Sequence, residues 1–277
     1  MAGTRTSTRS ERVASVGVRV LAGLVFGFLI APILVVIPLA FNDGTYFSYP
    51  MEGLSFRWFE AVFISPLWHR AFANSLGIGM ASTVLATVLG TLAALGVSRP
   101  EFPLRGIVLP LLLSPMIIPI VVVGVGLYAA FAPLGLAGSY TGVVLAHTAL
   151  GTPFVVITVT ATLASFDRSL IRAASGLGAG PSTVFRRVTF PLILPGVLTG
   201  AIFAFATSFD EIIVILFVGS VDQRTIPREM WAGIRDQISP AILAVATLLT
   251  LFAILLYAAI GVMRNQSTAR RLQTNGD

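Results

Sequence analysis

Two adjacent carboxylates, Asp210 and Glu211, stand inside an otherwise apolar stretch of the sequence. At the centre of a bilayer an acidic side chain costs roughly 2.5–3.5 kcal/mol on insertion scales, so such residues usually serve a purpose. A buried negative field lowers the cost of dehydrating a cation, which favours contact with a cationic substrate. The other interpretation is structural, with the carboxylates capping a helix or pairing with an arginine of another helix.

A single helix over residues 195–219 would place these acids in one half of a membrane. At 1.5 Å per residue, Asp210 lies about 22 Å beyond Pro195. Thr207 and Glu211 then share one face with small residues, Ser208 flanks that face, and bulky apolar residues occupy the opposite one. We therefore predict a water-filled path lined by four residues: Thr207, Ser208, Asp210 and Glu211.

The remaining polar residues do not suggest an enzyme. His147 is alone in an apolar segment, where a hydrogen bond to a neighbouring helix is the simplest expectation, and His69 at a loop edge should be solvated. No two histidines have metal-ligand spacing. The chain has no cysteine, which excludes disulfides and thiolate metal sites. We expect no catalytic residue, metal or cofactor in this chain.

All 18 basic residues are arginine, and the sequence contains no lysine. A phosphate-binding loop of the Gly-x-x-x-x-Gly-Lys-Ser/Thr type requires its lysine. If transport by this protein is driven by ATP, the ATP and its Mg²⁺ must therefore be bound by another polypeptide.

The elements that position these residues are membrane helices. The chain has 277 residues, of which 56% are hydrophobic and 11% charged, and its mean hydropathy is +0.90. A bilayer-spanning helix needs about 20 apolar residues. We predict an all-α membrane domain over 17–263, between an N-terminal segment 1–16 and a tail 264–277. Its six spans are 17–41, 71–97, 105–131, 141–165, 195–219 and 240–263.

The distribution of arginine predicts the orientation. Thirteen arginines lie before the first span or at its start, between spans two and three or at the start of span three, between spans four and five, and after the last span, whereas five lie in the other loops. Cytoplasmic loops carry the excess of basic residues. Both termini should therefore be cytoplasmic, and the net charge of +6 reflects this asymmetry rather than nucleic-acid binding. The first apolar run is too long for a secretory leader.

Two further segments have local signals. In the loop 42–70, the spacing of Phe56, Phe59 and Phe63 predicts a short helix at the membrane surface. Aromatic residues of this region fit an interfacial belt: Tyr46, Tyr49, Trp58 and Trp68. The span 105–131 contains three prolines, which predict a bent helix that packs tightly, lines a gated path, or does both.

A basic interruption at 167–187, here called the elbow, has a pattern too regular for a plain linker. It carries four arginines and one acid, and Gly178-Ala179-Gly180-Pro181 divides two short helical turns. Gly180 is placed to cap the second turn and Pro181 to begin it. A stiff basic segment on the cytoplasmic side predicts a docking site.

The elbow resembles the cytoplasmic signature loop of ABC importer permeases, which opens with Glu-Ala-Ala. Arg172-Ala173-Ala174 stands for the triplet, and Gly178, Val188 and Pro191 have the spacing of the family's glycine, aliphatic residue and proline. Arg172 departs from the usual glutamate. The acid pair and the segments 224–231 and 238–240 resemble the permeases of spermidine/putrescine importers.

This resemblance implies a type I importer permease in the bacterial inner membrane. It implies a coupling loop at about 166–193, whose coupling helix at 181–187 sits in a groove of a separate ATP-binding subunit, itself a dimer. It also implies a second, similar permease and a periplasmic binding protein that docks near 220–239. The ATPase-coupling residues would be Arg172, Ala173, Ala174, Gly178, Pro181, Phe185, Arg186, Arg187, Val188 and Pro191.

A second hypothesis remains open from the residues alone. A self-sufficient carrier could use Asp210 and Glu211 for cation or proton coupling. Such a carrier does not require the spacing or stiffness of the elbow. The substrate is also open, since similar permeases handle amino-acid derivatives, opines and other small solutes besides polyamines.

Overall fold

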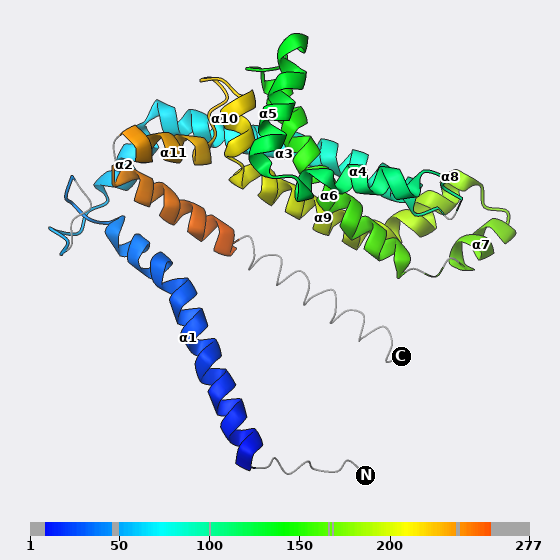
Figure 1. Cartoon of the computed structure of the whole chain (residues 1–277), viewed down its shortest axis with the longest axis horizontal. Coiled ribbons are helices and arrows are strands. Elements are labelled where there is room, and N and C mark those ends of the chain that lie inside the picture. The colour runs from blue at the N-terminus through cyan, green and yellow to red at the C-terminus, as the bar shows by residue number, and fades with distance from the viewer. Residues whose placement is uncertain are drawn as a thin grey trace. The chain divides into compact units, whose positions relative to one another are not determined.

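A computed structural model describes residues 9–45, 50–99, 101–165, 167, 169–236 and 239–255. Helices dominate these residues, as the sequence predicts (Figure 1). Several sequence predictions fall outside the described residues, namely those for Tyr46, Tyr49, Arg168, part of 238–240, and everything after 255. The α-helices are α1 (Arg9–Leu39), α2 (Arg57–Ile64), α3 (Pro66–Val97), α4 (Arg105–Ile117), α5 (Ile120–Phe131), α6 (Tyr140–Ala164), α7 (Ser169–Gly176), α8 (Pro181–Val184), α9 (Phe190–Asp210), α10 (Ile213–Val218) and α11 (Ile226–Asp236).

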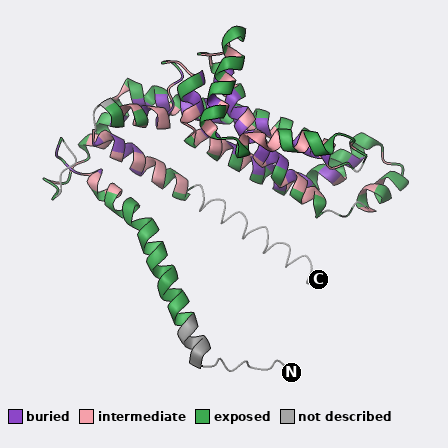
Figure 2. Ribbon diagram, viewed as in Figure 1, coloured by how far each residue is buried: buried purple, intermediate pink, exposed green. Residues whose placement is uncertain are grey.

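The chain divides into two compact units, one of residues 66–232 and the other of residues 1–65 with 233–277. In the unit 66–232, the long helices α3, α6 and α9 pack against one another and form the core. Figure 2 shows the buried residues of this unit concentrated along these three helices. The candidate site residues all belong to this unit.

Small residues allow α6 and α9 to approach closely. A Cβ atom placed on Gly200 would lie 2.7 Å from the Cα of Val155, and one on Gly196 would collide with the hydroxyl of Thr162. These two glycines stand four residues apart on one face of α9. Close backbone contact through such spacing is a common way for membrane helices to associate where the hydrophobic effect between them is weak.

Within the described residues, four helices are long and apolar enough to cross a membrane: Ser15–Leu39, Pro66–Val97, Tyr140–Ala164 and Pro181–Asp210. They correspond to predicted spans one, two, four and five. The apolar helix Ala241–Leu255 covers the described part of predicted span six. The count reaches five if α4 and α5 form one broken span.

Two predicted spans are not continuous helices. The bend predicted for 105–131 is confirmed, but it divides the segment into two helices, α4 and α5, which meet at an angle of 111°. Pro119 begins α5 as its N-cap in an extended conformation, and it cannot donate the amide hydrogen that a continuous helix requires. Predicted span five, 195–219, also breaks, since α9 ends at Asp210 and α10 begins at Ile213.

The other unit contains a membrane-span candidate and a folded loop. The apolar window of Ser15–Leu39 has no buried residue, as expected for a helix that faces lipid or another subunit. The loop after it folds through a bridge between Asn42 and Leu54 and a cluster of Phe41, Phe56 and Phe59. The short helix predicted in this loop is confirmed as α2.

Candidate functional site

The first helix of the elbow begins at a capping aspartate. The Asp167 carboxylate accepts hydrogen bonds from the backbone N–H of Ser169 (2.8 Å) and from its hydroxyl (2.7 Å). These bonds, the hydroxyl's first, hold the pKa of Asp167 below its ordinary value. An acidic residue at this position also interacts favourably with the N-terminal end of a helix. Local chemistry therefore sets the start of α7.

The same helix ends in a glycine-dependent turn. The N–H of Ala179 donates to the carbonyl of Ala174, and the N–H of Gly178 to that of Ser175. This pair of bonds is the Schellman motif, whose central residue takes a left-handed conformation. Gly178 has φ of +82°, which an L-amino acid adopts only at a cost. The positive φ at this position thus explains why the predicted motif has glycine here.

The second helix of the elbow starts where the sequence predicts. Gly180 is the N-cap of α8 and Pro181 its first residue. The helix does not end at 187, however, but continues through a π-helical turn at Phe185–Thr189 into α9. Pro191 has no amide hydrogen to donate to the carbonyl four residues earlier, so regular α-helical pairing is interrupted next to this turn. The predicted coupling helix is thus the first part of one helical run, Pro181–Asp210, called here the 181–210 helix.

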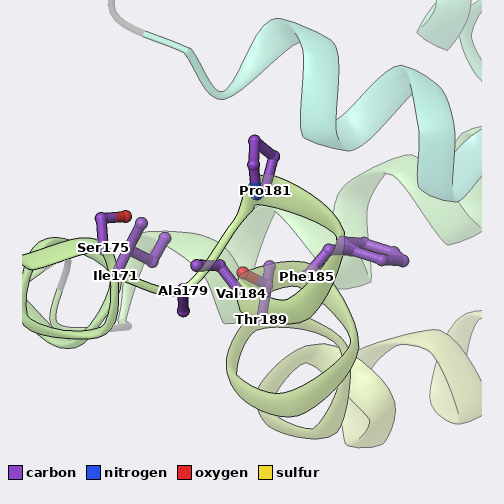
Figure 3. A pocket seen from close by; sticks show the side chains of 7 residues that line it. All are labelled: Ile171, Ser175, Ala179, Pro181, Val184, Phe185 and Thr189. Carbon is purple, nitrogen blue, oxygen red and sulfur yellow. The ribbon is translucent and has the colours of Figure 1, made fainter. Parts of the chain in front are cut away.

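An open apolar groove of about 440 Å³ separates the two helices of the elbow. Figure 3 shows Ile171 and Ser175 on one side and residues of α8 and the π-helical turn on the other. Its lining residues are Ile171, Ser175, Ala179, Pro181, Val184, Phe185 and Thr189. Of the predicted coupling residues, only Pro181 and Phe185 line this groove.

The other predicted coupling residues differ in solvent exposure. Arg172, Ala173, Gly178, Arg186, Arg187 and Pro191 are exposed, whereas Ala174 and Val188 are half-buried. Leu177, which the sequence prediction did not include, is 89% exposed at the Schellman turn. The elbow therefore exposes both arginines and apolar side chains.

At the other end of the 181–210 helix, the two carboxylates have different surroundings. Glu211 leaves the helical conformation, with ψ of 127°, and its Oε1 accepts a hydrogen bond of 2.7 Å from the N–H of Val214. It thereby satisfies an amide of the first turn of α10, the structural role that the sequence left open. Asp210 and Thr207 are not buried and remain accessible.

Ser208 belongs to a buried polar cluster rather than to an open face. Its hydroxyl lies 2.7 Å from Nδ1 of His147 on α6 and accepts a hydrogen bond from Ser82 on α3 (3.0 Å). The expectation that His147 bonds to a neighbouring helix is confirmed. Its Nε2 is buried and has no hydrogen-bond partner within the described chain. The cluster joins the three core helices near the acid pair.

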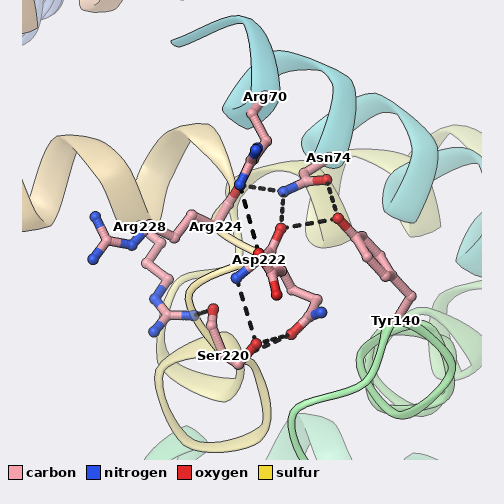
Figure 4. Close-up of polar contacts among 8 residues, drawn as sticks. Arg70, Asn74, Tyr140, Ser220, Asp222, Arg224 and Arg228 are labelled. Carbon is pink, nitrogen blue, oxygen red and sulfur yellow. Dashed lines mark hydrogen bonds and ion pairs between the residues drawn. The ribbon is translucent and has the colours of Figure 1, made fainter. Parts of the chain in front are cut away.

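Beyond α10, the loop 219–225 is held by side chains that the sequence did not single out. Asn74 of α3 donates to the carbonyls of Asp222 (2.7 Å) and Arg224 (2.8 Å), and Tyr140 of α6 bonds to Asn74 and Asp222 (Figure 4). We call Asn74, Tyr140 and this loop the loop clamp. A lone asparagine near the end of an apolar span is the only signal that could have indicated it.

Two arginines of the following segment complete this arrangement. Arg224 forms an ion pair with Glu229 (3.2 Å), and Arg228 donates to the carbonyl of Ser220 (2.6 Å). Burial lowers the pKa of Arg228, and the nearby charge of Arg224 adds to this effect. The loop before α11 therefore has most of its polar groups already paired. The sequence analysis did not predict helix α11.

The geometry of a helical membrane core with a protruding elbow agrees with the sequence comparison. Residues 86–266 match the family described as the binding-protein-dependent transport system inner membrane component. The chain belongs to this family. The match includes the elbow, the core helices α6 and α9, and the loop 219–225 after α10.

Individual relatives of this transport permease support the same family. It is 29% identical over 233 residues to the spermidine/putrescine transport system permease protein PotC of Haemophilus influenzae, covering 84% of this chain and 90% of the relative. It is 34% identical to the molybdenum transport system permease protein ModB of Mycobacterium bovis, covering 78% and 89%. A bacterial ABC transporter involved in the import of alginate has a similar fold, with a TM-score of 0.72, 17% identity, and coverage of 93% and 99%.

Proposed function

We propose that this multi-pass inner membrane protein forms the transport path of an ATP-driven importer for polyamines. It works with a separate ATP-binding dimer, a second permease and a periplasmic binding protein. The single observation that carries the ATP-driven part is the elbow, in which a Schellman turn and a Gly-Pro helix start hold two helices in a fixed relation. Membership in the binding-protein-dependent family supports the proposal and disfavours a self-sufficient carrier.

The geometry supports a mechanical route through the molecule. A force applied to the elbow acts directly on the 181–210 helix, because α8, the π-helical turn and α9 are continuous. This helix is packed against α6 through Gly196 and Gly200, and close-packed interiors transmit displacement rather than absorbing it. Closure of the ATP-binding dimer would therefore move the end that carries Asp210, switching access from one side of the membrane to the other.

The coupling role can be tested with a matched pair of glycines. Gly176 and Gly178 both have open space around their Cβ positions, but only Gly178 has positive φ. Gly178→Val should cost about 1–2 kcal/mol in the turn and abolish most ATP-driven uptake in vesicles, whereas Gly176→Val should leave uptake near the wild-type rate. Co-purification of the wild-type chain with an ATPase is the prerequisite. Equal uptake by both variants would contradict the coupling role.

The orientation proposal, with both termini and the elbow in the cytoplasm, has a simple test. Because the chain contains no cysteine, a single introduced thiol reports its own location. Ser182→Cys in the elbow should be protected from a membrane-impermeant maleimide in intact cells, and Asp222→Cys in the loop clamp should be labelled. The reverse labelling pattern would place the elbow outside and refute ATPase docking there.

Polyamine as the substrate is supported by the PotC relative and by the acid pair. Asp210 is exposed and unpaired in the described chain, so its negative charge is available to a cation. Asp210→Asn should reduce spermidine uptake about tenfold, the effect of losing one charged contact of about 1.4 kcal/mol. Glu211→Gln keeps an acceptor for the Val214 amide and should therefore preserve assembly while reducing uptake.

A second substrate class is favoured by one specific observation, the 34% identity to a molybdenum transport permease. Carboxylates in the path would repel an oxyanion, so the acid variants separate the two possibilities. If Asp210→Asn leaves spermidine uptake unchanged, the pathway role of the pair fails. Uptake of molybdate that rises in the same variant would support the molybdenum alternative.

A further inference from the structure

The elbow exposes positive charge that the described residues neutralise only in part. Arg172, Arg186 and Arg187 are exposed, and within the described residues the two ion pairs lie elsewhere, between Arg70 and Asp222 and between Arg224 and Glu229. The elbow's carboxylate, Asp167, accepts hydrogen bonds from Ser169 with both of its oxygens, and it attracts Arg172 electrostatically without forming an ion pair. The exposed guanidinium groups of all three arginines can therefore still bind a partner.

The elbow also exposes apolar groups on both sides of the turn at Gly178. Leu177 is 89% exposed and projects beside Gly178, and Phe185 is 39% exposed at the edge of the groove. The apolar surface consists of a projecting side chain and a hollow contributed by separate helices. A projecting side chain beside a hollow fits a folded protein surface of complementary shape. It fits less well against the flat headgroup region of a membrane, which binds a single amphipathic helix.

We propose that the elbow docks on an acidic surface of the ATP-binding subunit, with carboxylates facing Arg172, Arg186 and Arg187, a socket for Leu177, and an apolar side chain that fills the groove. This proposal rests on the proposed function and adds the chemistry of the partner. Arginine is suited to it, because its planar group pairs with a carboxylate through two parallel hydrogen bonds.

The test uses the full-length chain produced with its second permease and held in nanodiscs of phosphatidylcholine, a lipid without net charge. The probe is the ATP-binding subunit that co-purifies with the wild-type chain, afterwards purified separately, and the measurement is its dissociation constant at several salt concentrations. Arg186→Glu combined with Arg187→Glu should weaken binding about 30-fold or more, and Arg172→Glu should weaken it about tenfold. Binding of the wild type should also weaken steeply with salt, as expected for charged partners.

Matched controls separate charge at the elbow from charge in general. Arg70 and Val221 are exposed in the region of the loop clamp, at the other end of the core helices, so Arg70→Glu and Val221→Asp make the same changes away from the elbow and should leave the affinity within about twofold. Leu177→Asp should weaken binding about tenfold, and Arg186→Lys should weaken it less than the reversal does. Each variant must elute as the wild-type complex does in size-exclusion chromatography.

The outcomes distinguish this proposal from the function on which it rests. If the wild-type chain does not bind the ATP-binding subunit, the proposed function fails. If it binds but the reversals at 172, 186 and 187 leave the affinity unchanged, the acidic docking surface is refuted and the importer function stands. If the reversals matter only in nanodiscs containing anionic lipid, the arginines face headgroups and the proposal is overturned. If an acid-to-arginine change in the ATP-binding subunit restores binding of the Arg186→Glu variant, that acidic residue is the partner of Arg186.

Discussion

The two ends of the 181–210 helix differ in how their polar groups are satisfied. At the end that begins with Pro181, the elbow leaves exposed arginines and an apolar groove on its surface. At the end that finishes with Asp210, Glu211 binds the Val214 amide, Ser208 contacts His147, and the loop clamp fixes the residues beyond. The end at Asp210, here called the completed end, pairs most of its polar groups within this unit, although Asp210 and Nε2 of His147 have no partner among the described residues. The elbow, in contrast, presents several unused contact groups.

This difference indicates how one helix can connect a docking surface to a transport path. A buried polar group without a partner costs about 1–3 kcal/mol, so the end inside the helical core must pair its own groups. The elbow can keep its charges in water until another subunit covers them. We infer that rigidity is needed at the completed end, where the path lies, and adaptability is needed only at the elbow surface.

The strongest disruption of this arrangement should come from the helix between the two ends. Gly200→Val would place side-chain atoms where the backbone of Val155 and the hydroxyl of Thr158 lie, and should lower the free energy of unfolding by about 3 kcal/mol. Unfolding in mixed micelles, followed by tryptophan fluorescence, measures this loss. Because the two ends are joined by this helix, ATPase binding and substrate uptake should be reduced in parallel.

Gly96 provides the matched control for this substitution. It lies inside α3 with no atom within 4 Å of its Cβ position. Gly96→Val should therefore change the free energy of unfolding by less than about 0.5 kcal/mol. If both valine variants were equally stable, close packing of α6 and α9 at Gly200 would not hold the helix in place.

A second prediction compares two contacts on the same loop at the completed end. Asn74→Ala removes two hydrogen bonds to backbone carbonyls of 222 and 224 and the contact with Tyr140, which should cost about 2 kcal/mol. Arg70→Ala removes an ion pair whose side chains are 64% and 72% exposed, which should cost about 0.5 kcal/mol or less.

The difference between these two variants should also appear in function. Asn74→Ala should increase amide hydrogen exchange across 219–226 and reduce uptake, because the loop that precedes α11 loses its anchor. Arg70→Ala should behave as the wild type in both measurements. A larger effect of Arg70→Ala would mean that surface charge, and not the buried asparagine, holds the loop.

The elbow could be predicted from sequence because its structure depends on local chemistry. The Schellman turn at Gly178 and the helix start at Pro181 follow from the backbone preferences of single residues. The existence of spans one, two, four and five likewise follows from apolar length alone. These predictions needed no information about which helices meet.

The breaks and contacts at the other end could not be predicted in this way. The apolar composition of 195–219 is the same whether its helix continues or stops, and the stop at Glu211 depends on a hydrogen bond to Val214. Asn74 and Asp222 are 148 residues apart in the chain, and only the packing of α3 against its neighbours brings them together. For span three, proline predicted a bend, but the angle of 111° depends on the surroundings.

The smallest expected effect concerns the start of α7 and follows from the lowered pKa of Asp167. Hydrogen bonds from Ser169 stabilise the ionised carboxylate in the folded elbow. Its capping contribution is therefore complete above the ordinary carboxyl pKa of about 3.9, and it is lost as the pH falls through the lower pKa of the folded state. Asp167→Asn keeps an acceptor but does not titrate, and so should show no such loss.

Hydrogen exchange of the peptide 169–176 tests this, after correction for the intrinsic pH dependence of exchange with an unfolded peptide. Protection in the wild type should decline at acidic pH, while protection in Asp167→Asn should stay constant. The loop clamp, whose bonds to Asn74 are between uncharged groups, should not change over the same range. If protection were lost at acidic pH in the loop clamp but not in α7, this prediction would be contradicted. The completed end, and not the elbow, would then be the end whose structure depends on an exposed charge.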